Sequence, residues 1–334
     1  MKTTKPTSVS IVIATFNSSR TLTLCLKKVL GQDYPKKYIE IITADGGSKD
    51  NTIKIAKKYG AKVIHVDPKK QNAEYNKGIG LQAAKNDIVL FLDHDNIMPH
   101  RKWLSNLIAP FIEEKAIIGV EALRFHYDPK MTLLDRYFAL FGGTDPVVYY
   151  LGKNSHLSWS EDRYTLLGKS EDKGSYYEVS YLKSEIPALG GNGAAIRRRL
   201  LLKYAKSDPE SFIHVDVVAD LIRSGNNKYG IIKDTIIHLT NNNVLPFLSR
   251  RKYFIQEYQL GNKKRRYHTF DAKKDKGKMI AYILFSLTFV VPTWDALKGF
   301  IKVRDMAWFL HPFMCLAFLY LYGTAVIEEK IKHV

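Results

Sequence analysis

Carboxylate side chains follow two apolar segments near the N-terminus, where they could hold a ligand. Asp93 and Asp95 come directly after the run DIVLFL, and Asp45 follows the run IEIITA. Two carboxylates spaced two residues apart can share one hard cation such as Mg²⁺ or Mn²⁺, which prefers oxygen ligands and bridges diphosphate oxygens. An ordinary turn explains the same tripeptide, because Asp is common in turns.

The segment DGGSKDNT, from Asp45 to Thr52, carries a second group of candidate ligands. Asp45 could accept a hydrogen bond from a base or a ribose, and the two glycines let a backbone approach a ligand closely. The competing interpretation is a loop in which Asp50 caps the helix that follows.

A glycine-rich segment, GGNG at 190–193, precedes a stretch that we expect to be an apolar, basic helix. The backbone amides of Gly191 and Asn192 could meet phosphate or sugar oxygens. The segment is not a P-loop, because the Gly-Lys-Ser/Thr ending is absent. It also lies too far from the first strand to be a dinucleotide fingerprint.

Two further side chains could take part in proton transfer or metal binding. Asp216 opens the segment DVVADLIRSG, which predicts a helix ending at Gly225, and a carboxylate there could be a general base. It could equally cap the helix, and Asp220 lies one turn later as a competitor. His238 ends the apolar run IIKDTIIHL, either as a third metal ligand or as a structural histidine.

Alternating strands and helices are predicted to position these groups. The hydrophobic pattern predicts strands at 8–14, 39–44, 62–66 and 87–92, with helices at 18–30, 51–59 and 72–84 between them. This alternation indicates an α/β fold with a mostly parallel sheet and right-handed crossovers. Ligands bind at the carboxyl ends of such strands, which are residues 15–17, 45–48 and 93–95. Residues 142–180 are expected to form a long loop, a candidate lid or binding loop.

The C-terminal part has a different character. Residues 279–292 carry no charge, and residues 306–327 carry no Lys, Arg, Asp or Glu, a run long enough to cross a hydrocarbon core. Residues 250–278 hold eleven basic and three acidic residues. Lysines outside both runs suit a hairpin with cytoplasmic flanks, while an interfacial segment or a pair of buried core helices are the alternatives.

The overall charge and the cysteine content narrow the partners and the compartment. The 334 residues have a net charge of +18, which favours nucleic acid, anionic lipid or phosphorylated substrates. A nucleic-acid binder would explain the charge but not the carboxylates or the tail, so we expect no nucleic-acid partner. Two isolated cysteines fit a reducing compartment, and the N-terminus lacks the apolar core of a signal peptide.

Taken in order, these segments resemble the family 2 glycosyltransferases of GT-A fold. The resemblance covers residues 8–240 and rests on SIVIATFN, TADGGSKDNT, LFLDHDN, GGNGAAIRR and an acid before a helix that ends in Gly. It implies inverting transfer from a nucleotide-sugar, with Thr15, Asn17 and Asp45 lining the nucleotide site. It also implies that Asp93 and Asp95 form a metal-binding DXD motif for Mg²⁺ or Mn²⁺, and that Asp216 is the base.

The tail and two departures from the family pattern refine this expectation. Pro292, Trp294, His311-Pro312 and Tyr322-Gly323 resemble the membrane tail of envelope-sugar transferases in the family. Val215-Asp216 stands where the family usually has Glu-Asp, which leaves the base less secure. Arg265-Arg266-Tyr267 replaces the Gln-x-x-Arg-Trp motif of processive synthases, so a polymer-extruding synthase is not expected.

These inferences predict three regions and a membrane-associated enzyme with a cytoplasmic catalytic domain. Residues 1–245 would form the GT-A domain, with a nucleotide-binding part at 8–115 and an acceptor part at 116–245. Residues 246–278 would form a basic amphipathic linker, and 279–334 a membrane-associated hairpin without which the catalytic domain still folds. The nucleotide-sugar site would comprise Thr15, Asn17, Asp45, Asp93, Gly191 and Asn192, and the metal site Asp93, Asp95 and His238.

The expected reaction is hexosyl transfer to a lipid-linked or saccharide acceptor, with membrane lipid as a further partner. Two rivals remain open. One is a synthase that charges a polyprenyl phosphate with a single sugar. The other is a non-catalytic membrane protein that binds nucleotide-sugars.

Overall fold

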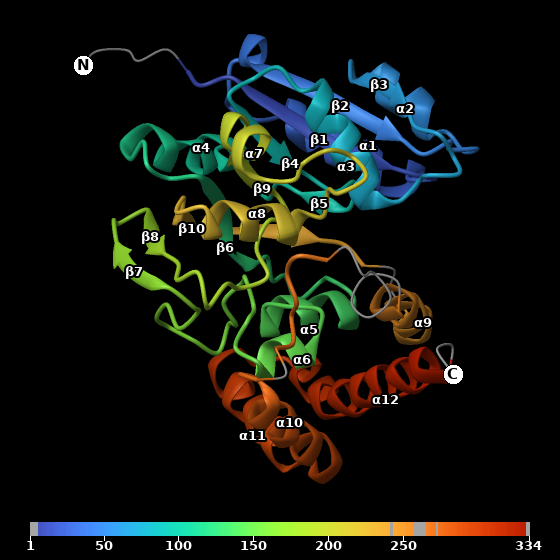
Figure 1. Ribbon diagram of the computed structural model, residues 1–334, viewed down its shortest axis with the longest axis vertical. Helices are drawn as coiled ribbons and strands as arrows, with labels where there is room; N and C mark the ends of the chain where they lie inside the picture. Colours follow the sequence, from blue (N-terminus) through green and yellow to red (C-terminus); the bar gives the residue numbers. More distant parts are fainter. Residues whose placement is uncertain (1–5, 241–242, 257–264, 272, 332–334) are drawn as a thin grey trace. The chain divides into compact units, whose positions relative to one another are not determined.

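The chain divides into two compact units. The computed structural model describes residues 6–240, 243–256, 265–271 and 273–331. Unit 1 contains residues 1–123 and 168–238, and unit 2 contains residues 124–167 and 239–334. Figure 1 labels the helices and strands of both units.

The first half of unit 1 alternates strands and helices as the sequence predicts. Strands β1, β2 and β4 are neighbours in a parallel arrangement, and β3 extends it beside β2. Every predicted strand and helix begins and ends within one residue of its predicted bounds, and the 3-10 helix η1 was not predicted. The elements are β1 (Val9–Thr15), α1 (Ser19–Leu30), the 3-10 helix η1 (Lys36–Tyr38), β2 (Ile39–Asp45), α2 (Thr52–Lys58), β3 (Lys62–His65), α3 (Ala73–Ala83) and β4 (Ile88–Phe91).

Burial explains why β1 pairs on both sides, between β2 and β4. Every residue of β1 is buried, as expected for a continuous β-branched run covered on both faces. Helix α3 packs against β1 at Gly80, where an added Cβ would lie 2.3 Å from a methyl carbon of Val12. The close approach of α3 to the sheet therefore depends on glycine at this position.

The second half of unit 1 adds antiparallel strands, so that the sheet is mixed. The strand order is β3-β2-β1-β4-β9-β6-β10-β8-β7, and the short β5 pairs with β10. Strand β9 joins the two halves because it pairs antiparallel with both β4 and β6. The elements are β5 (Asn96–Ile97), α4 (Trp103–Glu113), β6 (Gly119–Phe125), β7 (Lys169–Asp172), β8 (Tyr176–Ser180), β9 (Ala194–Arg197), α7 (Arg198–Tyr204), α8 (His214–Arg223) and β10 (Lys228–His238).

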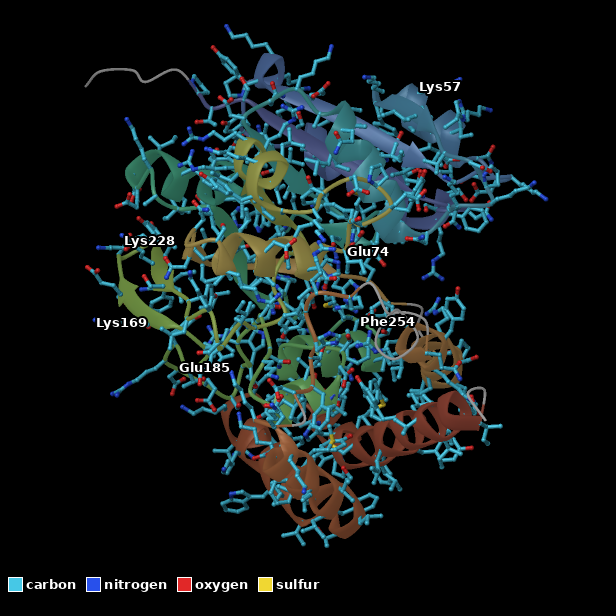
Figure 2. The ribbon with its side chains drawn as sticks, viewed as in Figure 1. Lys57, Glu74, Lys169, Glu185, Lys228 and Phe254 are labelled. Carbon is cyan, nitrogen blue, oxygen red and sulfur yellow. The ribbon has the colours of Figure 1, made fainter. Side chains whose placement is uncertain are left out.

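Two local predictions about the middle of the chain are wrong. Residues 142–180 are not a single loop, because they contain the short helix α6 (Pro146–Tyr150) and the β7–β8 hairpin. Asp145 accepts a hydrogen bond from the N–H of Val147 and caps the start of α6. Lys169 lies in β7 of the hairpin, and Lys228 lies in β10 (Figure 2). The GGNG segment leads into strand β9 rather than directly into a helix, because its apolar Ala194–Ile196 stretch is buried between β4 and β6.

Unit 2 is built mainly from helices around its own apolar core. Helices α5 and α6 supply one side of this core, and the C-terminal helices supply the other, with Trp308, Met314, Cys315 and Phe318 fully or almost fully buried. The elements are α5 (Leu133–Phe141), α6, α9 (Val244–Phe254), α10 (Lys276–Thr288), α11 (Val290–Lys302), the 3-10 helix η3 (Met306–Leu310) and α12 (His311–Ile331).

This packing bears on two expectations about the tail. Residues 124–167, expected in the acceptor part of the catalytic domain, cluster with the C-terminal helices instead. A chain that ended near residue 245 would expose core residues such as Tyr137, Phe138 and Phe141 of α5 to water. These shared core contacts oppose removal of the tail, and the expectation that the catalytic domain folds without it stays a prediction.

The two apolar runs of the tail form different structures. The segment Met306–Glu328 is long and apolar enough to cross a membrane, with a mean hydropathy of 1.6, and 39% of its most apolar window is buried within the protein. The first run is broken at Phe289, whose φ of 62° ends α10, and α11 continues at an angle of 81°. The proposed basic linker at 246–278 contains most of α9, while its residues 257–264 and 272, including Lys263 and Lys264, lie outside the described residues.

Candidate functional site

The carboxyl ends of β1, β2 and β4 meet at one edge of the sheet, where the sequence placed its candidate ligands. Thr15 and Asp45 are register partners at the ends of β1 and β2, and the Thr15 hydroxyl donates a 2.9 Å hydrogen bond to Asp45 Oδ2. The N–H of Leu92, just past β4, donates to the carbonyl of Val12 in β1. Asp93 therefore follows a strand end adjacent to that of Thr15.

Asp45 organises the loop that follows β2. Its Oδ1 accepts from the N–H groups of Gly47 and Ser48, and its Oδ2 accepts from the hydroxyls of Thr15 and Ser48. These four hydrogen bonds use the four acceptor positions of a carboxylate, and Asp45 is 1% exposed. In this arrangement the Asp45 carboxylate holds the loop in shape, and contacts with a ligand would have to come from other groups of the loop.

Asn17 joins the same loop from the other strand end. Its N–H donates to Ser48 Oγ at 2.8 Å, and its side-chain oxygen accepts from the N–H of Lys49 at 2.9 Å. Asn17 has a φ of 48°, a left-handed conformation that Asn tolerates better than most residues. Thr15, Asn17 and Asp45 are thus joined through hydrogen bonds to one loop, and their role in a nucleotide site stays a prediction.

Asp50 lies two residues before helix α2, whose N-cap is Asn51, so the alternative prediction of Asp50 as the cap is off by one residue. It accepts hydrogen bonds from the N–H of Thr52 at 2.9 Å and from the N–H of Ser19 at 3.1 Å. Burial alone would raise the pKa of Asp50, but these hydrogen bonds and those of the nearby hydroxyls lower it to about 2. Asp50 therefore links the starts of α1 and α2 as an ionised carboxylate.

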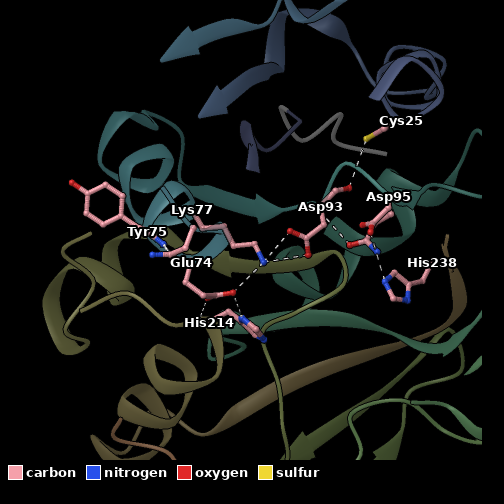
Figure 3. Close-up of polar contacts among 10 residues, drawn as sticks. Cys25, Glu74, Tyr75, Lys77, Asp93, Asp95, His214 and His238 are labelled. Atoms are coloured by element: carbon pink, nitrogen blue, oxygen red, sulfur yellow. Dashed lines mark hydrogen bonds and ion pairs between the residues drawn. The ribbon is translucent and has the colours of Figure 1, made fainter. Parts of the chain in front are cut away.

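Asp93 and Asp95 occupy a tight turn between β4 and β5. The N–H of Asp93 donates to the Asn96 side chain, and the N–H of Asn96 donates back to the Asp93 carbonyl. Strand β5 pairs with the end of β10, where His238 is the register partner of Asn96. This pairing brings His238 Nε2 to 4.0 Å from Asp95 Oδ2 (Figure 3).

The Asp93 carboxylate is held by a buried lysine from helix α3. Lys77 Nζ lies 3.0 Å from Asp93 Oδ1, 3.2 Å from Asp93 Oδ2 and 3.5 Å from Glu74 Oε1. Burial disfavours the charged forms of both side chains, but the attraction between their charges outweighs this effect. The attraction lowers the pKa of Asp93 and raises the pKa of Lys77.

Glu74 extends this ion-pair chain to the start of helix α8. Glu74 Oε1 lies 2.8 Å from His214 Nδ1, and Glu74 Oε2 accepts a 2.7 Å hydrogen bond from the N–H of His214 (Figure 3). Burial would raise the pKa of Glu74, but the neighbouring His214 and Lys77 groups offset burial and lower it. The chain Asp93–Lys77–Glu74–His214 therefore ties the DXD turn to the helix that carries Asp216.

The GGNG segment lies between these two elements. The N–H of Gly193 donates to the carbonyl of Phe91 at the end of β4, and an added Cβ on Gly191 would lie 3.2 Å from His214 Nε2. Asn192 between them has a φ of 50°. The segment thus contacts the end of β4 through Gly193 and the start of α8 through Gly191.

A buried carboxylate from strand β6 holds the start of the GGNG segment. Glu121 on β6 accepts a 2.5 Å hydrogen bond from the N–H of Gly190 and a 2.7 Å hydrogen bond from the hydroxyl of Tyr229 on β10. Burial raises the pKa of Glu121 to about 7 although both hydrogen bonds act in the opposite direction. The anchor of this loop consequently titrates near neutral pH.

The two candidate bases lie on different parts of α8. Asp216 is in the first turn and is fully buried. Asp220 accepts a hydrogen bond from the N–H of Lys206, in the segment that follows α7, at 3.2 Å. The hydrogen bond gives Asp220 a structural role, and Asp216 stays the predicted base.

The predicted metal ligands are only partly brought together in the structure. Among the residues that the structure describes, no three His, Cys, Asp or Glu side chains are gathered as a metal site. Asp95 and His238 face each other, whereas Asp93 is occupied by Lys77. The set Asp93, Asp95 and His238 therefore stays a prediction.

Four residues of this arrangement were missed by sequence reasoning. Glu74 and Lys77 lie on helix α3, which the sequence predicted, whereas His214 lies two residues before the predicted start of its helix and Glu121 lies on β6, a strand that was not predicted. The signal for the first pair is the EYNKG segment, in which Glu74 and Lys77 are three residues apart on one helix face. Their burial, at 7% and 3% exposure, is what distinguishes them from a surface pair.

Comparison with known proteins gives a match over most of unit 1. The model of glycosyl transferase family 2 matches residues 10–205. The glycosyltransferase AglE of Haloferax volcanii is 28% identical over 133 residues, which are 39% of this chain and 43% of AglE. A Methanococcus voltae protein, named dolichyl N-acetyl-alpha-D-glucosaminyl phosphate 3-beta-D-2,3-diacetamido-2,3-dideoxy-beta-D-glucuronosyltransferase, is 32% identical over 124 residues, 34% of this chain and 37% of that protein. The chain thus spans less than half the length of each relative.

A solved structure extends the comparison to nearly the whole chain. The mannosyltransferase PcManGT from Pyrobaculum calidifontis, solved in complex with GDP-Man and Mn²⁺, has a TM-score of 0.56 at 14% identity, covering 97% of this chain and 88% of that one. At this identity the likeness concerns the fold, and it agrees with the predicted GT-A fold.

Proposed function

The chain belongs to glycosyl transferase family 2, and on that premise we propose that it transfers a sugar from a nucleotide-sugar to a hydroxyl of a membrane-linked acceptor, with inversion at the anomeric carbon. The observation that carries the proposal is the meeting of Thr15, Asp45 and the Asp93–Asp95 turn at adjacent strand ends. Ligands of open α/β sheets bind at such an edge.

The donor site that we propose has a nucleotide half and a diphosphate half. Thr15, Asn17 and the loop shaped by Asp45 would contact the base and ribose. Asp93, with the amides of Gly191 and Asn192, would contact ribose, sugar or phosphate oxygens near the DXD turn. The buried ammonium group of Lys77 would lie beside the region of the diphosphate, with its charge balanced by Asp93 and Glu74 until Asp93 rearranges.

A divalent metal fits the residues on one side of this site. Asp95 is partly exposed and presents a carboxylate oxygen 4.0 Å from His238 Nε2, and both donor types suit Mn²⁺, with Mg²⁺ favouring the carboxylate. Asp93 would contribute as a ligand only after its ion pair with Lys77 rearranges. When bound, the metal would neutralise negative charge on the diphosphate leaving group. The Mn²⁺ and GDP-Man bound by PcManGT support this type of donor complex.

Asp216 would act as the general base. Its carboxylate would take the proton from the acceptor hydroxyl while that oxygen forms a bond to the anomeric carbon. The bond from the anomeric carbon to the diphosphate breaks on the opposite face, and the nucleoside diphosphate leaves with the electron pair. A single displacement inverts the anomeric centre and needs no second carboxylate nucleophile.

The acceptor that we propose is attached to a membrane lipid. The Methanococcus voltae relative carries the name of an enzyme that acts on a dolichyl phosphate sugar, and the apolar tail of this chain would keep its active site near such a substrate. We place the catalytic domain on the cytoplasmic side, where nucleotide-sugars are made.

The test is a screen of the purified full chain with UDP- and GDP-sugars, with Mg²⁺ or Mn²⁺, in detergent. Release of the nucleoside diphosphate, enhanced by a lipid-linked saccharide, is the expected result, and Asp95→Ala should abolish it. Transfer to a polyprenyl phosphate that survives Asp216→Asn would indicate a polyprenyl-phosphate sugar synthase instead. Donor binding without any turnover would indicate a non-catalytic protein.

A further inference from the structure

Each helix of the bent pair in unit 2, α10 and α11, presents a row of exposed apolar side chains. On α10 these side chains recur at intervals of three and four residues, and those on α11 have the same spacing. The exposed fractions run from 37% to 68% for Ile280, Ile283, Leu284, Leu287, Val290, Trp294, Leu297 and Ile301. Residues at such intervals lie on one face of a helix. An apolar row of this length in water is a surface that a partner normally covers.

Helix α12 continues this surface with its outward face only. Its inward face packs into the core of unit 2 through Met314, Cys315, Phe318 and Ala325, each buried to 1% exposure or less. It also exposes apolar residues at 39% to 69%, namely Phe313, Leu316, Tyr320, Val326, Ile327 and Ile331. Helix α12 is therefore divided lengthwise between protein and an external partner.

Polar contacts along the inward face argue against a transmembrane course for α12. His311 Nδ1, in its first turn, lies 3.0 Å from the Tyr137 hydroxyl, and Tyr322, three turns later, donates to Asp145 Oδ2 at 2.8 Å. Glu328 accepts from Lys252 of α9 at 2.7 Å. If α12 crossed a bilayer, these charged partners would be carried into hydrocarbon with it, at a large cost in free energy.

The charges around the apolar row indicate the type of partner. Between residues 273 and 305, the side chains of Asp275, Asp295 and Asp305 are buried or half-buried. The exposed charged residues in the same range are all basic: Lys273, Lys274, Lys276, Lys278, Lys298, Lys302 and Arg304. An apolar helix face bordered by exposed cations is the pattern of a helix that lies in the interface of an anionic bilayer.

We propose that α10, α11 and the outward face of α12 form a membrane-docking surface that lies flat in one leaflet of an anionic bilayer and does not span it. The surface holds unit 2 at the level of the headgroups, and Trp294 lies at the boundary between headgroups and acyl chains. This inference rests on the proposed function for its purpose, which is access to a lipid-linked acceptor, but not for its physical basis.

The binding test uses the full chain and vesicles of phosphatidylcholine with or without phosphatidylglycerol. We expect cosedimentation with the anionic vesicles that weakens at high salt, and a loss of binding of at least about tenfold in Leu287→Glu/Trp294→Glu, since burial of charge and loss of apolar area both oppose docking. The matched control is Leu24→Glu/Ile112→Glu, which replaces two exposed apolar residues of unit 1 and should bind as the wild type does.

The depth and the course of the helices are tested separately. Quenching of Trp294 fluorescence should be stronger by lipids brominated near the headgroup than by lipids brominated near the chain end. Single cysteines at the exposed positions Met306 and Ile331 should both react with an impermeant maleimide added outside the vesicles. Protection of one of them until the vesicles are lysed would show a transmembrane helix and overturn the proposal.

Two further outcomes would also overturn it. Vesicle binding that is unchanged in Leu287→Glu/Trp294→Glu would place the membrane contact elsewhere. A stable dimer of the wild type that the same variant dissociates, without vesicle binding, would show that a second copy covers the surface. Donor hydrolysis in detergent, measured for the wild type and the variant, tests the proposed function independently. If the wild type does not hydrolyse a donor, the enzyme assignment is refuted and the vesicle result is unaffected.

Discussion

The ammonium group of Lys77 lies 3.0 Å from Oδ1 of Asp93, and both side chains belong to the same buried ion-pair chain as Glu74. Lys77→Met should destabilise unit 1, because it leaves two carboxylates beside each other without their counter-charge. We expect a loss of about 3–5 kcal/mol in the free energy of unfolding, the usual effect of removing one partner of a buried ion pair. Urea denaturation of the full chain measures it.

Lys57 provides the matched control for this prediction. It is an exposed lysine on helix α2 of the same unit (Figure 2), so Lys57→Met removes the same charge without breaking a buried pair. We expect a change below about 0.5 kcal/mol for this variant. Equal effects of the two substitutions would mean that Lys77 acts only through the net charge of the protein.

Asp95 and Asp93 should differ in their importance for metal binding. Because Asp95 faces His238 and Asp93 is paired with Lys77, Asp95→Asn should abolish Mn²⁺ binding, while Asp93→Asn should weaken it less. Electron paramagnetic resonance of Mn²⁺ titrated into each variant measures the affinity directly. Turnover that persists in excess EDTA would show that the reaction proceeds without a metal.

Replacing Asp216 by Asn separates proton transfer from donor binding. The amide keeps the shape of the side chain but cannot accept the proton of the acceptor hydroxyl, so we expect turnover to fall by roughly a hundredfold or more, with donor affinity unchanged. Asp220→Asn is the control, because Asp220 is hydrogen-bonded to the backbone of Lys206. A large loss in Asp220→Asn with near-normal Asp216→Asn would reassign the base.

The strands and helices of the first hundred residues were predictable because local pattern and burial agree there. The run SVSIVIA is apolar at every position, so it fits only a strand covered on both faces, and β1 is buried throughout. The carboxyl ends of parallel strands then bring Thr15 and Asp45 together without further information. Where a strand pairs antiparallel with distant partners, as β9 does with β4 and β6, its four residues carry no such local signal.

The charged part of the site could not be predicted for a different reason. A Glu and a Lys three residues apart normally form a solvated pair on a helix surface. In the folded protein Glu74 contacts His214 at the start of α8, and Lys77 pairs with Asp93, which completes the charge balance of this buried pair. That coincidence depends on tertiary packing between segments more than a hundred residues apart, which a single sequence does not encode in its local pattern.

Glu121 should make the stability of unit 1 depend on pH near neutrality. Burial raises its folded pKa to about 7, above the unfolded value of about 4.3, so the folded state holds the proton more tightly. Between these two pH values the folded state binds one proton more than the unfolded state. The free energy of unfolding therefore falls as pH rises, by about 1.4 kcal/mol per pH unit at most. Glu121→Gln keeps an acceptor for Gly190 and Tyr229, and it should flatten this dependence.

Urea midpoints at pH 5 and pH 8 test the Glu121 prediction. The difference between wild type and Glu121→Gln should shift in favour of the variant at pH 8. Asp50→Asn serves as the comparison, because the pKa of Asp50 is lowered to about 2 and its protonation does not change in this range. A parallel dependence in all three proteins would assign the effect to other groups.

Gly299 in helix α11 should resist a substitution that normally stabilises helices. Ala is a better helix former than Gly by about 1 kcal/mol. A Cβ at Gly299, however, would lie 2.4 Å from ring carbons of Trp308, which is fully buried in the core of unit 2. Because neither the helix nor the indole can move freely, we expect Gly299→Ala to lower the free energy of unfolding by about 1–3 kcal/mol.

Gly323 in α12 offers the opposite case in the same unit, since a Cβ there would meet nothing within 4 Å. Gly323→Ala should raise the free energy of unfolding by about 0.5–1 kcal/mol. Thermal unfolding of both variants in detergent compares them, and a gain of stability in Gly299→Ala would show that α11 does not pack on Trp308 as described.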